Sequence, residues 1–184
     1  MRVSLAFSNN YAFSPKLIKH GDDVKELDLT ETGFRDFALL QHFPNLEILI
    51  LDNNEINFIQ FPYMPHLRVL WLNHNRLTNL DYLLSVLSTN CPSLIYLSLL
   101  DNPGAPSYFN SGTLAQYNAY RAKISCHLPS LKYLDCKELT DEEKNYSNTK
   151  VLTRSLSPPS IVSALSIQKN MRINKKDNND KTHI

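Results

Sequence analysis

Glycine and cysteine are scarce in this chain, which has four glycines and three cysteines in 184 residues. With so little glycine, a chain of this length is expected to form one domain with a packed core, followed by a tail. The cysteines form no C-x-x-C pair and lack the paired arrangement that is common on extracellular proteins built from repeats. A reducing, intracellular compartment is therefore expected.

Long apolar runs and short catalytic motifs are also lacking. No stretch approaches the roughly 20 apolar residues that span a bilayer, and the N-terminal apolar run is shorter than the roughly 7 to 15 residues of a secretory signal. The sequence contains no H-E-x-x-H, G-x-x-x-x-G-K-[ST] or G-x-G-x-x-G motif. We expect no membrane insertion, no cofactor, no metal and no enzymatic activity.

Charge divides the chain near residue 146. Residues 1–144 carry 12 basic and 16 acidic side chains, a net charge of −4, whereas residues 145–184 carry 7 and 2, a net charge of +5. The second part is polar and rich in asparagine, so little apolar surface offsets the cost of ordering it. We expect a mostly disordered basic tail over residues 147–184. Its residues 161–171 have apolar side chains at helical offsets, which fit either a solvated stretch or a motif that folds on a partner.

One pattern, L-x-x-L-x-L-x-x-N, recurs in a single register. It occurs at residues 46–56, 67–77 and 94–104, and at residues 24–34 with Thr32 in place of asparagine. The starts are 22, 21 and 27 residues apart, which is typical of leucine-rich repeats. Degenerate copies flank them at residues 2–12, with Asn10 in phase, and at residues 131–139.

These repeats predict an α/β fold: a leucine-rich-repeat solenoid with a curved parallel β-sheet, an irregular or helical convex side and a C-terminal cap. The expected boundaries are a degenerate N-terminal repeat or cap at 1–23, repeats at 24–112, a cap at 113–146 and the tail. Residues 34–45 and 80–92 have apolar residues at helical spacing, so a helix or a turn is expected in each. Pro62 and Pro65 exclude a regular helix in the return segment that contains them.

The asparagine of each repeat is expected to be structural. Asn54, Asn75 and Asn102 stand where the chain leaves a strand, and a side-chain amide there satisfies backbone groups that no ladder reaches. Loss of one such amide costs roughly 1 to 3 kcal/mol. Thr32 has less hydrogen-bonding capacity, so the first full repeat is expected to be the weaker one.

The single tryptophan, Trp71, lies between two leucines of a repeat. Side chains alternate across a strand, so burial of Leu70 and Leu72 places Trp71 on the opposite, concave face. The centre of that face is predicted to be apolar and aromatic with an acidic rim, which favours a protein-binding site. The alternative is that these side chains pack on one another or under the tail. The expected contact residues are Ile48, Ile50, Asp52, Val69, Trp71, Asn73, His74, Tyr96, Ser98 and Asp101.

Few side chains in the sequence are candidates for a catalytic role. His74 beside Asp101 resembles an acid and base pair, but no serine or cysteine nucleophile stands at a matched position, so a polar rim contact is expected. Cys126 and His127 are adjacent on a helix and point in different directions. Cys91 and Cys136 are interpreted as packing residues, the second at a core-leucine position.

The segment after the repeats has the features of a cap. Thr113 and Gln116 form a capping box, and an apolar stripe of Leu114, Tyr117, Tyr120, Ile124 and Leu128 follows until Pro129. A strand and a second capping box, Thr140 with Glu143, come next. Such a unit closes the open end of a solenoid, so the tyrosines and Arg121 are expected to be structural.

Residues 117–143, "YNAYRAKISCHLPSLKYLDCKELTDEE", resemble the C-terminal cap of intracellular leucine-rich-repeat proteins such as the spliceosomal A-prime protein and the acidic nuclear phosphoproteins. Together with "NLDYLLSVLSTNCPSLIYLSLLDNPGAP", they are similar to the leucine-rich melanocyte differentiation-associated protein family, and the resemblance covers roughly residues 24–144. That family implies a monomeric, cytoplasmic, non-catalytic adaptor in membrane trafficking and pigment-organelle biogenesis, with a protein partner such as a vesicle-associated small GTPase. The alternative is an A-prime-like subunit of a nuclear ribonucleoprotein that binds protein. No direct nucleic-acid contact is expected, because the folded part is acidic.

Overall fold

The computed structural model describes residues 1–8, 13–107 and 111–144. Asn10, the expected tail at 147–184 and the possible helix at 161–171 lie outside this part of the chain. Contacts divide the chain into residues 1–147 and residues 148–184, and the helices and strands described all belong to the first unit.

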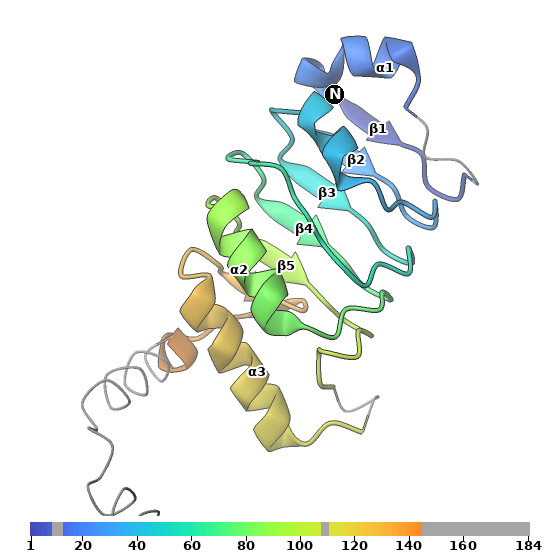
Figure 1. Cartoon of the computed structure of the whole chain (residues 1–184). Helices are drawn as coiled ribbons and strands as arrows, with labels where there is room; N and C mark the ends of the chain where they lie inside the picture. Colours follow the sequence, from blue (N-terminus) through green and yellow to red (C-terminus); the bar gives the residue numbers. More distant parts are fainter. Residues whose placement is uncertain (9–12, 108–110, 145–184) are drawn as a thin grey trace, which may run out of the picture. The chain divides into compact units, whose positions relative to one another are not determined.

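Seven short strands form one sheet in sequence order (Figure 1). The strands are β1 (Arg2–Ser4), β2 (Glu26–Asp28), β3 (Ile48–Ile50), β4 (Val69–Trp71), β5 (Tyr96–Ser98), β6 (Tyr133–Leu134) and β7 (Lys137–Glu138). The pairs from β1 to β6 are parallel, whereas β6 and β7 are antiparallel. Each parallel strand thus comes from one repeat, including the degenerate copies at both ends.

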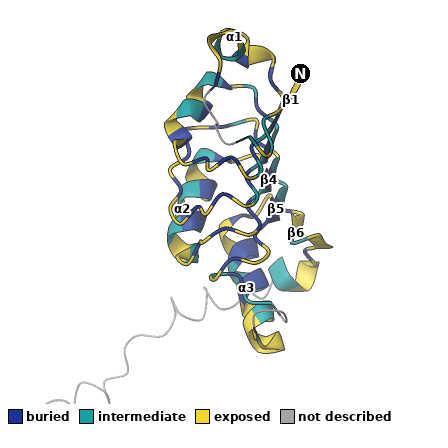
Figure 2. Cartoon of the chain, turned by 90° about the vertical axis from the view of Figure 1, so that its right-hand side faces the viewer, coloured by how far each residue is buried: buried dark blue, intermediate teal, exposed yellow. Residues whose placement is uncertain are grey.

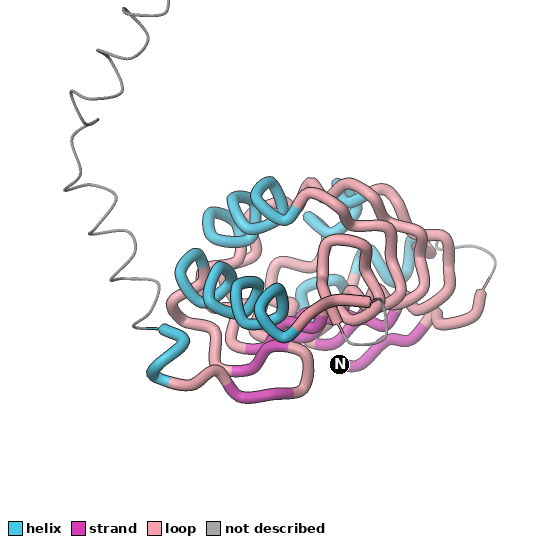
Figure 3. The backbone as a smooth tube through the Cα atoms, turned by 90° about the horizontal axis from the view of Figure 1, so that it is seen from below, coloured by secondary structure: helices cyan, strands magenta, loops and turns pink. Residues whose placement is uncertain are grey.

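The segments that return from one strand to the next differ in conformation. The helices are α1 (Pro15–Lys19), α2 (Leu80–Asn90) and α3 (Leu114–His127), with 3₁₀ helices η1 (Gly21–Asp23) and η2 (Phe37–His42). The helical returns at η2 and α2 are confirmed, and residues 57–65 contain no helix, as Pro62 and Pro65 predict. Viewed along the stack, the strands gather on one side, and loops and helices form the other (Figure 3).

The leucines of the repeats fill the space between these two sides. Leu27, Leu49, Leu70 and Leu97 are aligned in the middle of successive strands, and each has 0% of its surface exposed. Because one such layer cannot bury its apolar side alone, the stacked repeats share one continuous core (Figure 2). The chain is a leucine-rich-repeat α/β solenoid, which confirms the predicted fold class.

Helix α3 closes the C-terminal end of this core. Its predicted capping box is confirmed, because Thr113 and Gln116 bond each other's backbone N–H groups. The predicted apolar stripe is wrong at its start, since Leu114 is 74% exposed. The stripe is confirmed at Tyr120, Ile124 and Leu128, and Arg121 is buried beside them, so a charged side chain occupies part of the face that packs on the core.

The segment after α3 differs from a regular repeat. Cys136, expected in the core, is exposed, and this prediction is wrong. Asp135 and Cys136 both have positive φ, 52° and 64°, which is the conformation of a two-residue hairpin turn. The chain therefore turns back into β7 instead of continuing inward, and Leu139 takes the core place at 3% exposed. Residues 141–144 form a helical turn, with the predicted bonds between Thr140 and Glu143. Among the described residues, no helix is long and apolar enough to cross a membrane.

Candidate functional site

The concave face is the side of the sheet opposite the leucine core. Strand pairing aligns two columns of side chains on it. The first column holds Arg2, Glu26, Ile48, Val69, Tyr96 and Tyr133, and the second holds Ser4, Asp28, Ile50, Trp71 and Ser98. The register that the repeats predict is therefore confirmed, and the face changes from charged at β1 and β2 to apolar from β3 onward.

The apolar part of the face is built around stacked aromatic rings. Trp71 and Tyr96 are stacked with ring centroids 5.3 Å apart, and Tyr133 continues the row at 6.4 Å from Tyr96. Val69 beside them is partly exposed, as are Trp71 and Tyr96, while Tyr133 is 41% exposed. The cap tyrosines were expected to be structural, yet Tyr133 lies on this face. Its position in "LKYLD" matches that of Tyr96 in "LIYLS", so the repeat register carried the signal.

Acidic and polar side chains rim the face where the strands end. His74 Nε2 lies 3.4 Å from Asp101 Oδ2, and both side chains are about half exposed. Both residues have positive φ, as do Glu31 and Asn53 at the same position of earlier repeats. This turn points the rim side chains outward, and the contact between His74 and Asp101 is an exposed polar contact of small energetic value.

Two of the expected contact residues are buried, and their assignment is corrected here. Asn73 is 6% exposed and Ser98 is 0% exposed. The Ser98 hydroxyl donates to Asn73 Oδ1 at 2.7 Å, and the Leu100 N–H donates to the same oxygen at 2.9 Å. Because these groups bond one another under the neighbouring side chains, they stabilise the sheet and are not available to a partner.

Asp52 joins this network and remains at its surface. Its carboxylate accepts hydrogen bonds from the Asn73 N–H at 2.8 Å and from the Asn73 side-chain amide at 3.2 Å. Burial raises the pKa of Asp52, and the two bonds from Asn73 oppose that shift. Asp52 is thus a partly buried acid held in one orientation, which makes it a fixed polar contact at the edge of the aromatic patch.

The three repeat asparagines lie under the turns on the core side. Asn75 is 5% exposed. Its oxygen accepts from the N–H groups of Asn54 and Ile56, and its nitrogen donates to the carbonyls of Leu51 and Leu72. Asn54 and Asn102 make equivalent bonds one repeat away on each side. These amides connect neighbouring repeats and have no exposed atoms to offer a ligand.

Cys136 lies at the far end of the concave face. Its sulfur is 3.2 Å from the Tyr96 hydroxyl. Partial burial and this contact raise the pKa of Tyr96 above its ordinary value, so Tyr96 is neutral at physiological pH. The ring therefore presents an apolar face and a polar tip, which is typical of aromatic residues at protein interfaces.

Among the residues that the structure describes, Ser98 and Cys91 are buried reactive side chains. The Ser98 hydroxyl bonds Asn73 and is buried, so it is no partner for His74. Burial raises the pKa of the Cys91 thiol to about 12, which leaves it protonated. Within the described ranges, no three His, Cys, Asp or Glu side chains are grouped to hold a metal ion. The face as built offers apolar, aromatic and hydrogen-bonding contacts.

Comparisons with known proteins agree with the repeat architecture. No protein-family model matches the chain. It is 41% identical over 113 residues to the leucine-rich melanocyte differentiation-associated protein of Homo sapiens, across 60% of this chain and 57% of that protein. It is 30% identical over 120 residues to U2 small nuclear ribonucleoprotein A' of Candida glabrata, across 64% of this chain and 41% of that protein. The resemblance that the cap predicts is confirmed. The chain spans about half the length of these curated relatives.

Among solved structures, the chain is similar to the Drosophila melanogaster SNF/U2A' complex, with a TM-score of 0.42 and 18% sequence identity. The match covers 66% of this chain and 80% of that chain.

Proposed function

We propose that the chain is a non-catalytic interaction module that binds a protein partner on its concave face. The observation that carries this proposal is the partly exposed row of Val69, Tyr96 and Tyr133 beside Trp71, with Asp52 held at its edge. Stacked aromatic rings supply large contact area at small entropic cost, and aromatic residues dominate the energetic centres of interfaces.

The biological setting that we favour is that of an adaptor in membrane trafficking and pigment-organelle biogenesis. The similarity to a protein named for melanocyte differentiation supports it. The partner in this setting is a vesicle-associated small GTPase, and the chain acts as a monomer in the cytoplasm or on vesicles. No direct contact with nucleic acid is part of this proposal, because the described part of the chain is acidic.

A second candidate function is that of an A-prime-like subunit of a nuclear ribonucleoprotein. The similarity to U2 small nuclear ribonucleoprotein A' supports it. The concave face would again bind protein, so the two candidates differ in partner and compartment. Localisation of the tagged chain to vesicles or to the nucleus discriminates between them.

The test is affinity capture with the full chain, followed by binding measurements on the purified partner. Trp71→Ala should weaken binding by about 2 kcal/mol or more, the range of an interface hot spot, and leave the melting temperature nearly unchanged. Tyr63→Ala is the matched control, because Tyr63 is 67% exposed on the irregular return and lies off the concave face.

The identity of the captured proteins separates the two settings. Trafficking GTPases or coat proteins lost with Trp71→Ala favour the adaptor, and splicing proteins lost with it favour the nuclear subunit. Equal capture by wild type and Trp71→Ala would show that the concave face is not the contact.

A further inference from the structure

A groove lies on the opposite side of the molecule from the concave face. Its floor is the return after β3, residues 56–64, which has no helix because of its prolines. On one side the floor contacts η2 through Phe37 and Phe61, whose rings meet edge to face at 5.2 Å. On the other side it contacts α2, since the Asn90 side chain donates to the Phe61 carbonyl at 2.9 Å. The floor therefore contacts both helical returns, and the residues that line the cavity come mainly from η2, from the segment before it, from the floor and from Arg76.

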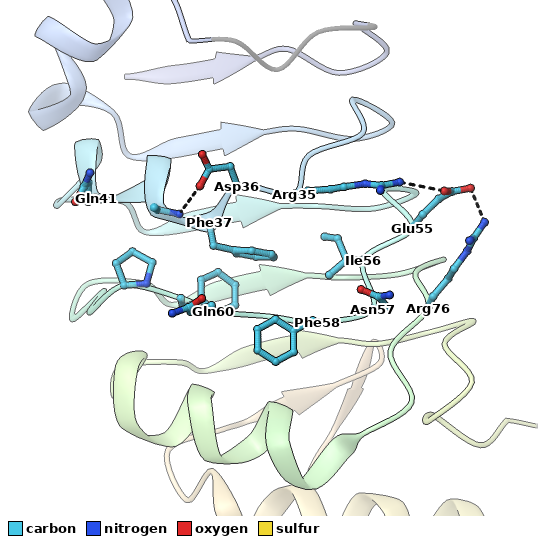
Figure 4. Close-up of a pocket in the computed structure, with 13 residues that line it drawn as sticks. Arg35, Asp36, Phe37, Gln41, Glu55, Ile56, Asn57, Phe58, Gln60 and Arg76 are labelled. Atoms are coloured by element: carbon cyan, nitrogen blue, oxygen red, sulfur yellow. Dashed lines mark hydrogen bonds and ion pairs between the residues drawn. The ribbon is translucent and has the colours of Figure 1, made fainter.

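This groove contains a cavity of about 520 Å³ (Figure 4), a size typical of ligand pockets. Phe37, Ile56 and Phe61 line it and are nearly buried. Phe58 lines it too, yet is 56% exposed, and its ring stacks on Tyr82 of α2 at 4.8 Å. An exposed ring that is held in place at the apolar part of the cavity can contact an apolar side chain of a partner.

The main chain of the floor offers free hydrogen-bonding groups. Among the described residues, no backbone hydrogen bond is made by the N–H or C=O groups of residues 57–60. The bonds that hold the segment are outside this stretch, at Ile56 and at Phe61. A run of unpaired groups in an extended segment can accept a second chain in the manner of an added strand.

One end of the groove carries two guanidinium groups. Arg35 and Arg76 share the single carboxylate of Glu55, at 3.5 Å and 2.6 Å (Figure 4). Their side chains are 70% and 64% exposed. Five N–H donors are available on each guanidinium, so one carboxylate leaves most of them without a protein acceptor. Asp36 also lines the cavity, but its carboxylate accepts from the Ala38 N–H and caps η2.

We propose that this groove binds an extended, acidic peptide segment of a partner protein. The peptide main chain pairs with residues 57–60, an apolar side chain enters the cavity against Phe58, and a carboxylate pairs with Arg35 and Arg76. The unpaired main chain, the cavity and the two arginines lie along one groove. An extended acidic peptide supplies a matching group for each of them: a main chain, an apolar side chain and a carboxylate. This site is separate from the concave face and does not depend on the function proposed for it.

The test uses a phage-displayed library of random linear peptides, selected on the full chain. The selected peptides should share a large apolar residue followed or preceded closely by Asp or Glu. Arg76→Glu and Phe58→Ala should each weaken their binding by about tenfold or more, because each removes a principal contact. Lys132→Glu is the matched charge control, since it reverses an exposed cation that is far from the groove in sequence, directly before β6.

Amide hydrogen exchange supplies a second readout. The N–H groups of residues 57–60 should exchange fast in the free chain and become protected when a selected peptide is added. The melting temperature of each variant shows whether a loss of binding reflects unfolding.

Several outcomes would overturn the proposal. These are a selection without a shared motif, binding unchanged by both groove variants, and amides that stay unprotected. Binding that is lost with Trp71→Ala but kept with Arg76→Glu would assign the peptides to the concave face. Self-association of the chain that Arg76→Glu abolishes would make a second copy the occupant instead. Failure here leaves the concave-face proposal standing, because that proposal is tested with a different variant.

Discussion

The two ends of the solenoid close the same kind of core in different ways. At the N-terminal end, α1 buries none of its five residues, and Leu17 and Ile18 cover the core only partly. At the C-terminal end, α3 buries Tyr120, Ile124 and the whole of Arg121. The N-terminal end is thus covered by apolar side chains, whereas at the C-terminal end a buried charge is bonded to two carbonyls and a carboxylate.

Arg121 shows what the second arrangement achieves. Its guanidinium donates to the Leu134 carbonyl at 3.2 Å, to the Glu138 carbonyl at 2.7 Å and to the Glu143 carboxylate. These acceptors belong to β6, to β7 and to the helical turn at 141–144. A single side chain therefore connects three segments to α3, which no apolar residue of the same size could do.

The largest expected loss of stability comes from a substitution at the C-terminal end of the solenoid. Glu143→Gln leaves the buried Arg121 without its counter-charge, and breaking a buried ion pair costs about 3 to 5 kcal/mol of unfolding free energy. Chemical denaturation followed by circular dichroism measures the loss. Glu142→Gln is the control, because Glu142 is an exposed neighbour in the same helical turn. Equal stability of the two variants would mean that the pair does not fasten this end.

The loss of stability in Glu143→Gln should depend on pH. Partial burial raises the pKa of Glu143, but hydrogen bonds from Arg121 and Thr140 outweigh it and hold the pKa below the ordinary glutamate value. Stability from such a group is present above the unfolded-state pKa and is lost as pH falls through the folded-state pKa. The difference between wild type and Glu143→Gln should therefore be largest near about pH 7 and shrink toward about pH 3.

The contribution of Asp135 to stability should depend on pH in the opposite direction. Burial raises its pKa, although the Leu99 N–H and the Tyr120 hydroxyl bond it. Its contribution is full below the unfolded-state pKa and is lost as pH rises through the folded-state pKa. The stability of wild type relative to Asp135→Asn should fall with rising pH. Parallel profiles for the Asp135 and Glu143 variants would contradict this account of the cap.

Smaller losses of stability are expected from Asn75 in the middle of the stack and from Thr32, the equivalent residue nearer the N-terminal end. Asn75→Ala should cost about 1 to 3 kcal/mol, because it leaves backbone groups of two repeats unpaired. Thr32→Ala should cost less, since the single Thr32 hydroxyl proton is shared between the Leu29 carbonyl at 2.9 Å and Asn54 Oδ1 at 3.2 Å. Thermal denaturation of both variants measures the order, and a larger loss at Thr32 would reverse the expectation that the first repeat is weaker.

The smallest expected effect is at α1. Ser14 caps this helix by accepting from the Leu17 N–H at 3.2 Å, and loss of such a cap costs about 0.5 to 1 kcal/mol. The cost should be at the low end of that range, because α1 buries no residue. Thr113→Ala, which removes the cap of α3, is the matched comparison and should cost more. If Ser14→Ala proved the more damaging change, the N-terminal end would be more tightly closed than its packing indicates.

Much of the concave face could be predicted from the repeats. The column of Trp71 follows from the alternation of side chains along a strand and from the common register of the leucines. The rest depended on contacts between repeats. Asn73 and Ser98 share the outward face with Trp71, yet neighbouring strands bring their polar groups within bonding distance and bury them.

The sequence by itself determined the solenoid, the order of the strands and the side chains that fill the core, because these depend on short periodic patterns within each repeat. Only the tertiary structure decided that Arg121 is buried, that Cys136 turns outward and that the return after β3 leaves a cavity beside η2. The burial of Arg121 and the cavity depend on segments that are distant in sequence, whereas the exposure of Cys136 depends on a local turn that interrupts the repeat pattern. Periodicity within one segment carries no information about the partner that a neighbouring segment supplies.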